Sequence, residues 1–255
     1  MPSSRDPLYV FDPPLVPARL VRRYKRFLAD VVLEEVNSDN ETITVHCPNP
    51  GAMTGCAEAG MRVWLAPVHS PTAKLPYRWV LSETARGVCV GVDTGLANLL
   101  VHRLIARRLV PELAGYDRIT REVRLHEKTR LDFLLEDMQG GHPPLMMEVK
   151  SVTLRRGPTL AFPDAPTTRG RRHLDDLARL VAAGKQQAAI FYLAQRADGN
   201  QVTIAADIDP AYARAAERAQ AAGVRFLARR LKLTSCAIFD NGPLPYCDDP
   251  PYVER

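Results

Sequence analysis

The sequence lacks the motifs of zinc-binding, disulfide-rich and membrane-spanning proteins. Its five cysteines form no C-x-x-C pair, and no two histidines have zinc-finger spacing. The odd number of cysteines and the lack of a secretory signal predict a protein of the reducing cytoplasm. No apolar run is long enough to span a bilayer, so no membrane partner is expected. The loop CPNPGAMTGC lacks the spacing of a P-loop, which leaves a structural turn as its simplest interpretation.

The bulk composition permits binding to a polyanion without establishing it. The 255 residues suffice for one large domain or two small ones, and a charged fraction of 25% is ordinary for a globular protein. The net charge of +5 favours acidic partners such as nucleic acid, but many basic proteins bind none.

Residues 18–93 are predicted to form a small β-barrel of the OB type. Short β-type runs separated by turn residues are typical of a closed or partly open barrel. The first run is too long for one ordinary strand, so we expect it to bend or bulge. The runs are LVRRYKRFLADVVLEEV, ETITVHC, MRVWLAPV, YRWVLSET and GVCVGV.

Residues 94–242 predict an α/β domain with the order αβββαβ. Leucines at helical spacing predict a first helix over Thr94–Val110, with Thr94 as its N-cap and a proline after its end. The flanking residues 1–17 and 243–255 are rich in proline and predict a flexible arm and a tail. The remaining core segments are ITREVRLH, RLDFLLE and LMMEVKSV as strands, TTRGRRHLDDLARLVAAGK as a helix capped by Thr167 or Thr168, QAAIFYLAQ as a strand, and a further helix and strand after Asp209.

The two strands between Arg130 and Lys150 carry the most informative charged residues. Side chains two apart in a strand share a face, so Glu148 and Lys150 point the same way. Asp132 is expected to share its face with Arg130, opposite Leu131 and Phe133. If the strands pair, Asp132, Glu148 and Lys150 converge. Such charges are costly among apolar strands unless they are paired or bind a metal.

This arrangement has a defined chemistry. Asp132, Glu148 and the backbone carbonyl of Val149 would form an oxygen site suited to Mg²⁺ or Mn²⁺. Lys150 could orient a water molecule and stabilise developing charge. An Asp followed by Glu-x-Lys on the next strand resembles the PD-(D/E)xK nuclease superfamily. The alternative is a salt-bridged edge hairpin, because structural ion pairs also occur in strands.

Longer motifs extend the resemblance over about residues 18–231. RYKRFLADV, HCPNPGAMTGC, RLDFLL, EVKSVTL and FPDAPTTRGRRHL occur in this order and together resemble the sugar fermentation stimulation protein (SfsA) family. The resemblance implies an α+β protein with an N-terminal OB-like barrel, a C-terminal nuclease-like domain and an association with DNA binding. The resemblance does not by itself imply that this chain cuts nucleic acid.

Two basic segments are candidate nucleic-acid contacts. Arg22, Arg23, Lys25 and Arg26 alternate with aromatic residues on the first barrel run, a composition that suits phosphate contact and base stacking. The alternative is a solvated strand. The segment after the Glu-x-Lys strand is expected to be a long loop that holds phosphate next to the site. It contributes Arg169, Arg171 and Arg172 as contacts, with Asp164, Thr168 and His173 as supporting residues. Asp164 and His173 could orient water or substrate, and the helix N-terminus at Thr168 would add partial positive charge. In the alternative, Asp164 and Thr168 are helix caps and the arginines are solvated.

One departure from the nuclease pattern bears on catalysis. Many enzymes of that superfamily carry an acidic residue on the helix before the first core strand, but residues 94–110 contain none. Asp93, Glu112 and Glu122 are the nearest substitutes. This departure weakens the case for a second metal and for efficient catalysis.

The sequence therefore leaves three functional hypotheses. The first is a DNA-binding protein, with RNA as an open alternative, that has a Mg²⁺- or Mn²⁺-dependent phosphodiester-hydrolysing site. The second is a non-catalytic DNA-binding regulator of sugar metabolism genes on an inert nuclease fold. The third is an enzyme acting on a small phosphorylated or sugar-linked substrate.

Overall fold

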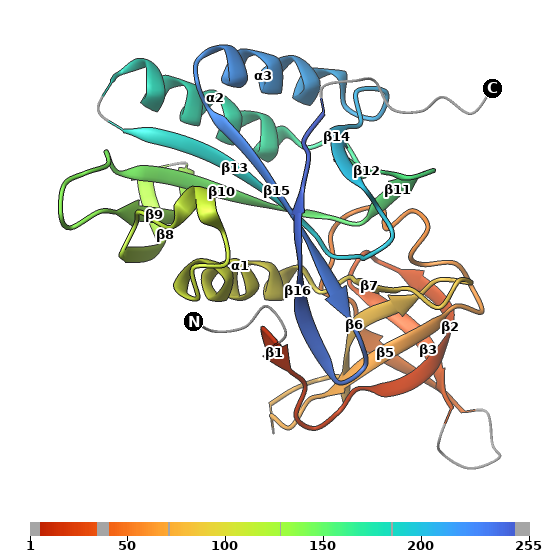
Figure 1. Ribbon diagram of the computed structural model, residues 1–255. Coiled ribbons are helices and arrows are strands. Elements are labelled where there is room, and N and C mark those ends of the chain that lie inside the picture. The colour runs from red at the N-terminus through yellow and green to blue at the C-terminus, as the bar shows by residue number, and fades with distance from the viewer. Residues whose placement is uncertain (1–5, 35–40, 71, 128, 185, 248–255) are drawn as a thin grey trace.

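The computed structural model describes residues 6–34, 41–70, 72–127, 129–184 and 186–247. Residues 16–91 form a β-barrel (Figure 1), in which the strands follow the order β4-β3-β2-β5-β6 and close through a β4–β6 pairing, while β7 adds to β6. Val31, Leu65 and Trp79 are among the residues that fill the barrel core. The strands are β2 (Val16–Tyr24), β3 (Leu28–Leu33), β4 (Thr42–His46), β5 (Arg62–Pro67), β6 (Tyr77–Glu83) and β7 (Cys89–Gly91).

The second domain is built on a mixed sheet with the strand order β1-β16-β15-β13-β10-β9-β8. Strands β10, β13 and β15 run parallel, and β8, β9 and β16 are antiparallel to their neighbours. The strands are β1 (Tyr9–Val10), β8 (Arg118–His126), β9 (Thr129–Glu136), β10 (Leu145–Val152), β13 (Gln187–Ala194), β15 (Arg225–Leu233) and β16 (Ala237–Leu244).

Helices cover both faces of this sheet. Helix α1 (Ala97–Ala106) and the barrel lie on one side, and α2 (Thr168–Ala182) and α3 (Pro210–Ala221) lie on the other (Figure 1). Successive side chains of β10 point to opposite faces of the sheet and so contribute to both cores. Leu145 and Met147 pack in the core beneath α1, and Met146 packs in the core beneath α2 and α3. None of the described helices is both long and apolar enough to cross a membrane.

A small sheet extends the domain beyond the strands that the sequence predicts. The first part of the expected arginine-rich loop after β10 instead folds into β11 (Leu154–Arg156) and β12 (Thr159–Phe162), which pair with each other, and β12 also pairs with β14 (Gln201–Ile204). These short strands precede α2 and fix the path of the chain from β10 to the start of that helix. Two 3₁₀ turns, η1 (Thr94–Leu96) and η2 (Pro111–Leu113), flank α1. Asp93, rather than Thr94, caps the first turn.

The N-terminal segment differs from the flexible arm predicted over residues 1–17. From residue 6 onward it packs on the C-terminal domain, where β1 pairs with β16 and Leu8, Phe11 and Leu15 enter the core beneath α1. Arg103 Nη1 donates to the Leu8 carbonyl at 2.6 Å. Burial of apolar side chains therefore overrides the proline signal, and only the first five residues lie outside the described part.

The tail predicted over residues 243–255 is also partly structured. Leu244 ends β16, and Tyr246 stacks on Tyr192 with ring centroids 5.7 Å apart. Residues 248–255 lie outside the described residues.

The long first barrel run is a hairpin rather than one bent strand. Its turn places Lys25 and Arg26 at φ values of 47° and 61°, in the left-handed region that non-glycine residues rarely adopt. The barrel consequently has two strands where one was expected, and its charged turn projects from one end.

Candidate active site

A cavity of about 550 Å³ lies where the barrel meets the C-terminal domain. The three predicted side chains of the Asp and Glu-x-Lys pattern all line it. Its wall is completed by the barrel, α1 and the segment before α2, through Arg26, Asn49, Gly51, Thr94, Asn98, Phe162, Asp164, Thr167 and Arg169. The site is therefore a product of both domains.

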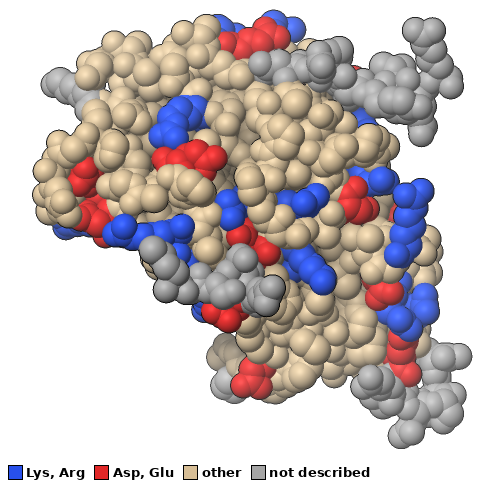
Figure 2. Space-filling model, viewed as in Figure 1, with Lys and Arg blue, Asp and Glu red and all other residues tan. Residues whose placement is uncertain are grey.

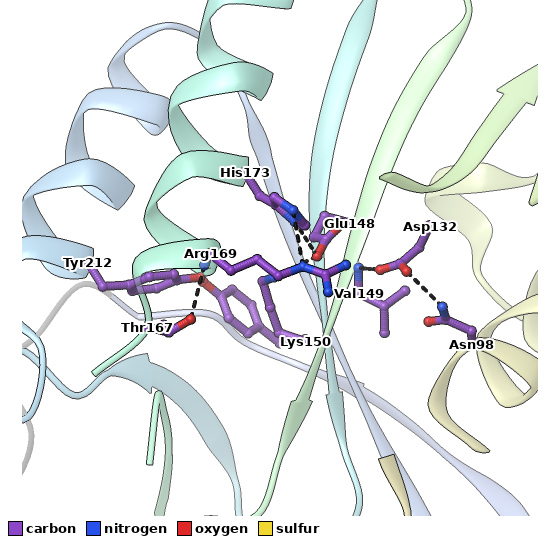
Figure 3. Close-up of polar contacts among 11 residues, drawn as sticks. Asn98, Asp132, Glu148, Val149, Lys150, Thr167, Arg169, His173 and Tyr212 are labelled. Atoms are coloured by element: carbon purple, nitrogen blue, oxygen red, sulfur yellow. Dashed lines mark hydrogen bonds and ion pairs between the residues drawn. The ribbon is translucent and has the colours of Figure 1, made fainter. Parts of the chain in front are cut away.

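Asp132 lies on β9 at the point where pairing with β10 ends. The register between these strands runs only as far as Phe133 opposite Met147. Beyond it, Asp132 Oδ2 accepts the main-chain N–H of Val149 at 2.7 Å, and Oδ1 accepts from Asn98 Nδ2 at 2.7 Å (Figure 3). These two donors fix the carboxylate beside β10.

The predicted facing of β9 is wrong at this position. Leu131 packs in the core beneath α2 and α3, whereas Phe133 packs in the core beneath α1. The two residues therefore do not share a face. On the neighbouring strand, Glu122 has a φ of 55°, which interrupts regular β geometry opposite Asp132. The β8–β9 register omits a pair between Glu122 and Asp132, and Asp132 instead accepts from the Val149 N–H at the end of the β10 ladder.

Glu148 has one oxygen occupied and one without a partner. Its Oε1 accepts from Lys150 Nζ at 2.7 Å and lies 2.5 Å from His173 Nδ1. Its Oε2 is buried and has no hydrogen-bond partner among the described residues. Because an unpartnered buried carboxylate oxygen is costly, this atom is a vacant acceptor for a cation or a donor.

Burial and charge act differently on the two carboxyl groups. Burial, reinforced by the negative charge of Glu148, raises the pKa of Asp132 to about 6. Burial alone would also raise the pKa of Glu148, but the charge of Lys150 and the contact with His173 outweigh it and lower that pKa to about 2. Divergent pKa values for two carboxyl groups in one cavity are typical of functional sites.

The donor set fits a hard divalent cation. In a strand, the N–H and C=O of one residue point to the same neighbour, so the carbonyl of Val149 points to the side on which its N–H meets Asp132. Asp132, Glu148 Oε2 and this carbonyl would supply oxygen ligands, and water would supply the rest. No group of three or more His, Cys, Asp and Glu side chains with metal-binding geometry occurs in the described part of the chain. Two carboxylates and one carbonyl are too few to enclose an ion completely. They suit an ion such as Mg²⁺ or Mn²⁺, which keeps several bound water molecules.

Asn98 lies on the helix where many PD-(D/E)xK enzymes carry an acidic residue. It lies on α1 and contacts Asp132 directly. The three suggested substitutes lie elsewhere: Asp93 caps η1 and pairs with Arg78, Glu122 is exposed, and Glu112 lies on η2. An amide carries no charge, so patterns of acidic residues gave no signal for Asn98.

Asp164 lines the cavity and also joins the two domains, while its predicted role in orienting water or substrate stays a prediction. Its Oδ2 accepts the main-chain N–H of Met53, in the barrel loop, at 3.0 Å. Gly51 lies so close that an added Cβ would be 2.7 Å from Asp164 Oδ1. The family-type loop CPNPGAMTGC thus forms the barrel side of the cavity and is held there by the nuclease-like domain.

The predicted supporting residues on α2 separate into two groups. Thr167, not Thr168, caps the helix by accepting from Gly170 N at 3.0 Å, and Thr167 lines the cavity. Thr168 instead accepts from Arg171 on the outer surface. His173 is buried behind Glu148 as described.

Arg169 extends from α2 across the cavity mouth (Figure 3). Its Nε donates to His173 Nε2 at 3.4 Å, which leaves the imidazole proton on Nδ1, facing Glu148. Arg171 and Arg172 do not line this cavity and face the outer side of α2.

The basic residues of the first barrel strand also differ in role. Arg22 pairs with Asp30 at 2.8 Å, and Arg23 donates to the carbonyls of Asn49 and Ala52 at 2.7 and 3.3 Å. Arg23 therefore supports the barrel loop from within. Lys25 is exposed in the β2–β3 turn, and the neighbouring Arg26 reaches the cavity.

Comparison with known proteins decides the family. The model described as "Sugar fermentation stimulation protein RE domain" matches residues 95–236, and the "SfsA N-terminal OB domain" matches residues 21–92. The chain belongs to the SfsA family. The expected α+β fold, with an N-terminal OB domain followed by a C-terminal domain that contains the order αβββαβ, is therefore confirmed, and the likeness of this second domain to PD-(D/E)xK nucleases stays a prediction.

Individual relatives match nearly the whole chain. The SfsA homologue of Dinoroseobacter shibae is 49% identical and covers 85% of this chain and 87% of its own. The homologue of Azorhizobium caulinodans is 48% identical, and the match covers 92% of this chain and 98% of that homologue. A solved structure of Pyrococcus furiosus SfsA in complex with Ca²⁺ is 28% identical, covers 95% of this chain and 99% of its own, and has a TM-score of 0.84.

Proposed function

We propose that this SfsA-family chain binds DNA and hydrolyses phosphodiester bonds at the Asp132–Glu148–Lys150 site with Mg²⁺ or Mn²⁺. The observation that carries the proposal is the buried, unpartnered Oε2 of Glu148, which lies in the same cavity as Asp132. A cation would satisfy this oxygen and offset the raised pKa of Asp132.

Asp132, Glu148 and the Val149 carbonyl would hold the metal. When bound, such an ion polarises a phosphodiester and lowers the pKa of a coordinated water. The Ca²⁺ complex of the Pyrococcus furiosus relative supports a divalent ion in this family, because Ca²⁺ and Mg²⁺ both prefer oxygen ligands.

The protein groups around this site have complementary tasks. Asn98 and the Val149 N–H orient Asp132, and His173 restrains Glu148 from behind. The ammonium group of Lys150 sits on Glu148 Oε1, where it can also stabilise negative charge on a substrate phosphate. Arg26 and Arg169 line opposite sides of the cavity and can hold the flanking phosphates.

Nucleic acid is the partner that this cavity favours, and DNA is the form that the family resemblance implies. The site combines metal ligands with guanidinium groups, and the barrel that borders it is an OB domain, a fold that often binds oligonucleotides. RNA has the same phosphodiester linkage and belongs in the same assays. A cytoplasmic location is part of the proposal and is supported by the five free cysteines.

One observation favours the second function, a non-catalytic DNA-binding regulator of sugar metabolism genes. Asn98 places a neutral amide against Asp132 where a further carboxylate would strengthen metal binding. In that case the nuclease fold would bind DNA without cutting it.

The two functions are separated by a cleavage assay with single- and double-stranded DNA and with RNA, in EDTA and in each metal. We expect cleavage with Mg²⁺ or Mn²⁺ that falls at least about 100-fold in Asp132→Asn and in Lys150→Met. Glu122→Gln is the matched control, because this carboxylate is exposed and, among the residues that the structure describes, forms an ion pair only with Arg130. Cleavage that persists in Asp132→Asn would refute the proposed site. DNA binding without cleavage by the wild type would favour the regulator.

A further inference from the structure

Two arginine-lined depressions continue from the candidate site across the outer surface of α2. The first, of about 430 Å³, lies between α2 and the β8–β9 hairpin and contains Arg124, Arg130, Arg169 and Arg172. The second, of about 460 Å³, lies between α2 and α3. Its basic residues are Arg171, Arg172, Arg179, Arg214 and Arg218.

Shared residues make these depressions one continuous path. Arg169 lines both the catalytic cavity and the first depression, and Arg172 lines both depressions. In the second depression, Arg171, Arg172 and Arg179 lie along one side of α2, and Arg214 and Arg218, four residues apart, face them from α3. We call this continuous surface the arginine path.

Internal acidic groups neutralise only part of the arginine path. Arg218 pairs with Asp175 at 2.9 Å, Arg179 with Asp176 at 2.8 Å and Arg130 with Glu122 at 3.8 Å. Glu127 also lines the first depression. Within the described ranges, Arg124, Arg172 and Arg214 form no ion pair. Clustered guanidinium groups repel one another, so this density of positive charge points to an external polyanion.

The basic residues of the barrel strand are fewer and partly engaged within the barrel, although Lys25 and Arg26 are exposed and form no ion pair within the described residues. Arg22 is paired with Asp30 and Arg23 is used to hold the loop at the cavity. Along the barrel at the lower right of Figure 2, Lys and Arg alternate with Asp and Glu.

We infer that the phosphate backbone of a bound nucleic acid leaves the candidate site along the arginine path, over α2 toward α3. This inference rests on the proposed nucleic-acid binding, but it needs neither the metal nor cleavage. The barrel then contributes the cavity wall and Arg26, while the sequence-independent affinity comes mainly from the helical layer.

The test is a fluorescence anisotropy titration of the full chain in EDTA, with a labelled DNA duplex of about 20 base pairs and KCl between about 50 and 200 mM. The path variant combines Arg172→Gln, Arg214→Gln and Arg218→Gln. The control variant combines Lys74→Gln, Arg86→Gln and Arg118→Gln, which are exposed and lie outside these cavities. Both variants lower the net charge equally, and thermal melting verifies that both fold.

Each phosphate contact contributes about 0.9 to the magnitude of the slope of log affinity against log salt concentration. The path variant removes three arginines, so the magnitude of its slope should fall by about 2.7. The control variant should lose less than about 1. Equal losses in the two variants would overturn the inference, as would a loss of affinity for phosphatidylglycerol vesicles with unchanged DNA binding. If the wild type fails to bind DNA at any salt concentration, the nucleic-acid part of the proposed function fails as well. Absence of cleavage alone would leave the arginine path standing.

Discussion

The contact between Gly51 and Asp164 makes a quantitative prediction about how the two domains hold the cavity. A Cβ at position 51 would lie 2.7 Å from Asp164 Oδ1 and 2.9 Å from its Cγ, closer than atoms can approach. Gly51→Ala therefore displaces the Asp164 carboxylate, and we expect this displacement to break its 3.0 Å hydrogen bond from Met53 N–H. A hydrogen bond to a charged group contributes about 1.5–3 kcal/mol, and we expect a loss of that size in the free energy of unfolding.

A double-mutant cycle isolates this effect. In an Asp164→Ala background the obstructing carboxylate is gone, so adding Gly51→Ala should cost less than about 0.5 kcal/mol. Urea unfolding can be followed by tryptophan fluorescence, since both tryptophans, Trp64 and Trp79, lie in the barrel. If Gly51→Ala costs the same in both backgrounds, the Asp164 contact is not what excludes a side chain at position 51.

Three further predictions follow from buried charges. Asp240→Ala should lower the free energy of unfolding by about 3–5 kcal/mol, because it leaves the buried guanidinium of Arg229 without its 2.5 Å partner. Asp175 is exposed, so Asp175→Ala should cost less than about 1 kcal/mol in the same urea titration. A similar cost for both substitutions would contradict this account. Asn98→Asp adds a carboxylate beside Asp132, so Mn²⁺ affinity near neutral pH should rise about tenfold. Without metal the two like charges repel, so the melting temperature in EDTA should fall. Unchanged Mn²⁺ affinity would show that position 98 does not reach the ion. In metal-free protein, burial and the charge of Glu148 raise the pKa of Asp132 from 3.8 to about 6, so ionisation is less favourable in the folded state. The free energy of unfolding should therefore fall by about 3 kcal/mol as the pH rises from about 4 to above 6. Asp132→Asn should remove that fall, and identical pH profiles for the two proteins would refute the shift.

The sequence predicted the αβββαβ core and the shared face of Glu148 and Lys150 because these follow from simple periodicities. Residues two apart in a strand share a face, which correctly paired Glu148 with Lys150. Capping and helix-ending residues located α2 and α3. The facing of Asp132 failed because it depends on the left-handed Glu122 on a neighbouring strand, for which a glutamate gives no signal.

Other features needed three-dimensional packing to become visible. The β2–β3 turn at Lys25 and Arg26 has no turn-forming residue, so the hairpin was predicted as one strand. The N-terminal prolines concealed the burial of Leu8 and Phe11. Asn98 carries no charge and lies on a helix whose periodicity shows only its apolar face, so its contact with Asp132 could not be predicted.

The central claim is that Asp132 and Glu148 together bind one divalent ion. Titration of Mn²⁺ followed by electron paramagnetic resonance tests it without any substrate. We expect one tight site per chain in the wild type, with affinity at least about 100-fold weaker in Asp132→Asn and in Glu148→Gln, and unchanged in Glu122→Gln. Mn²⁺ binding that survives both substitutions at full affinity would contradict the account.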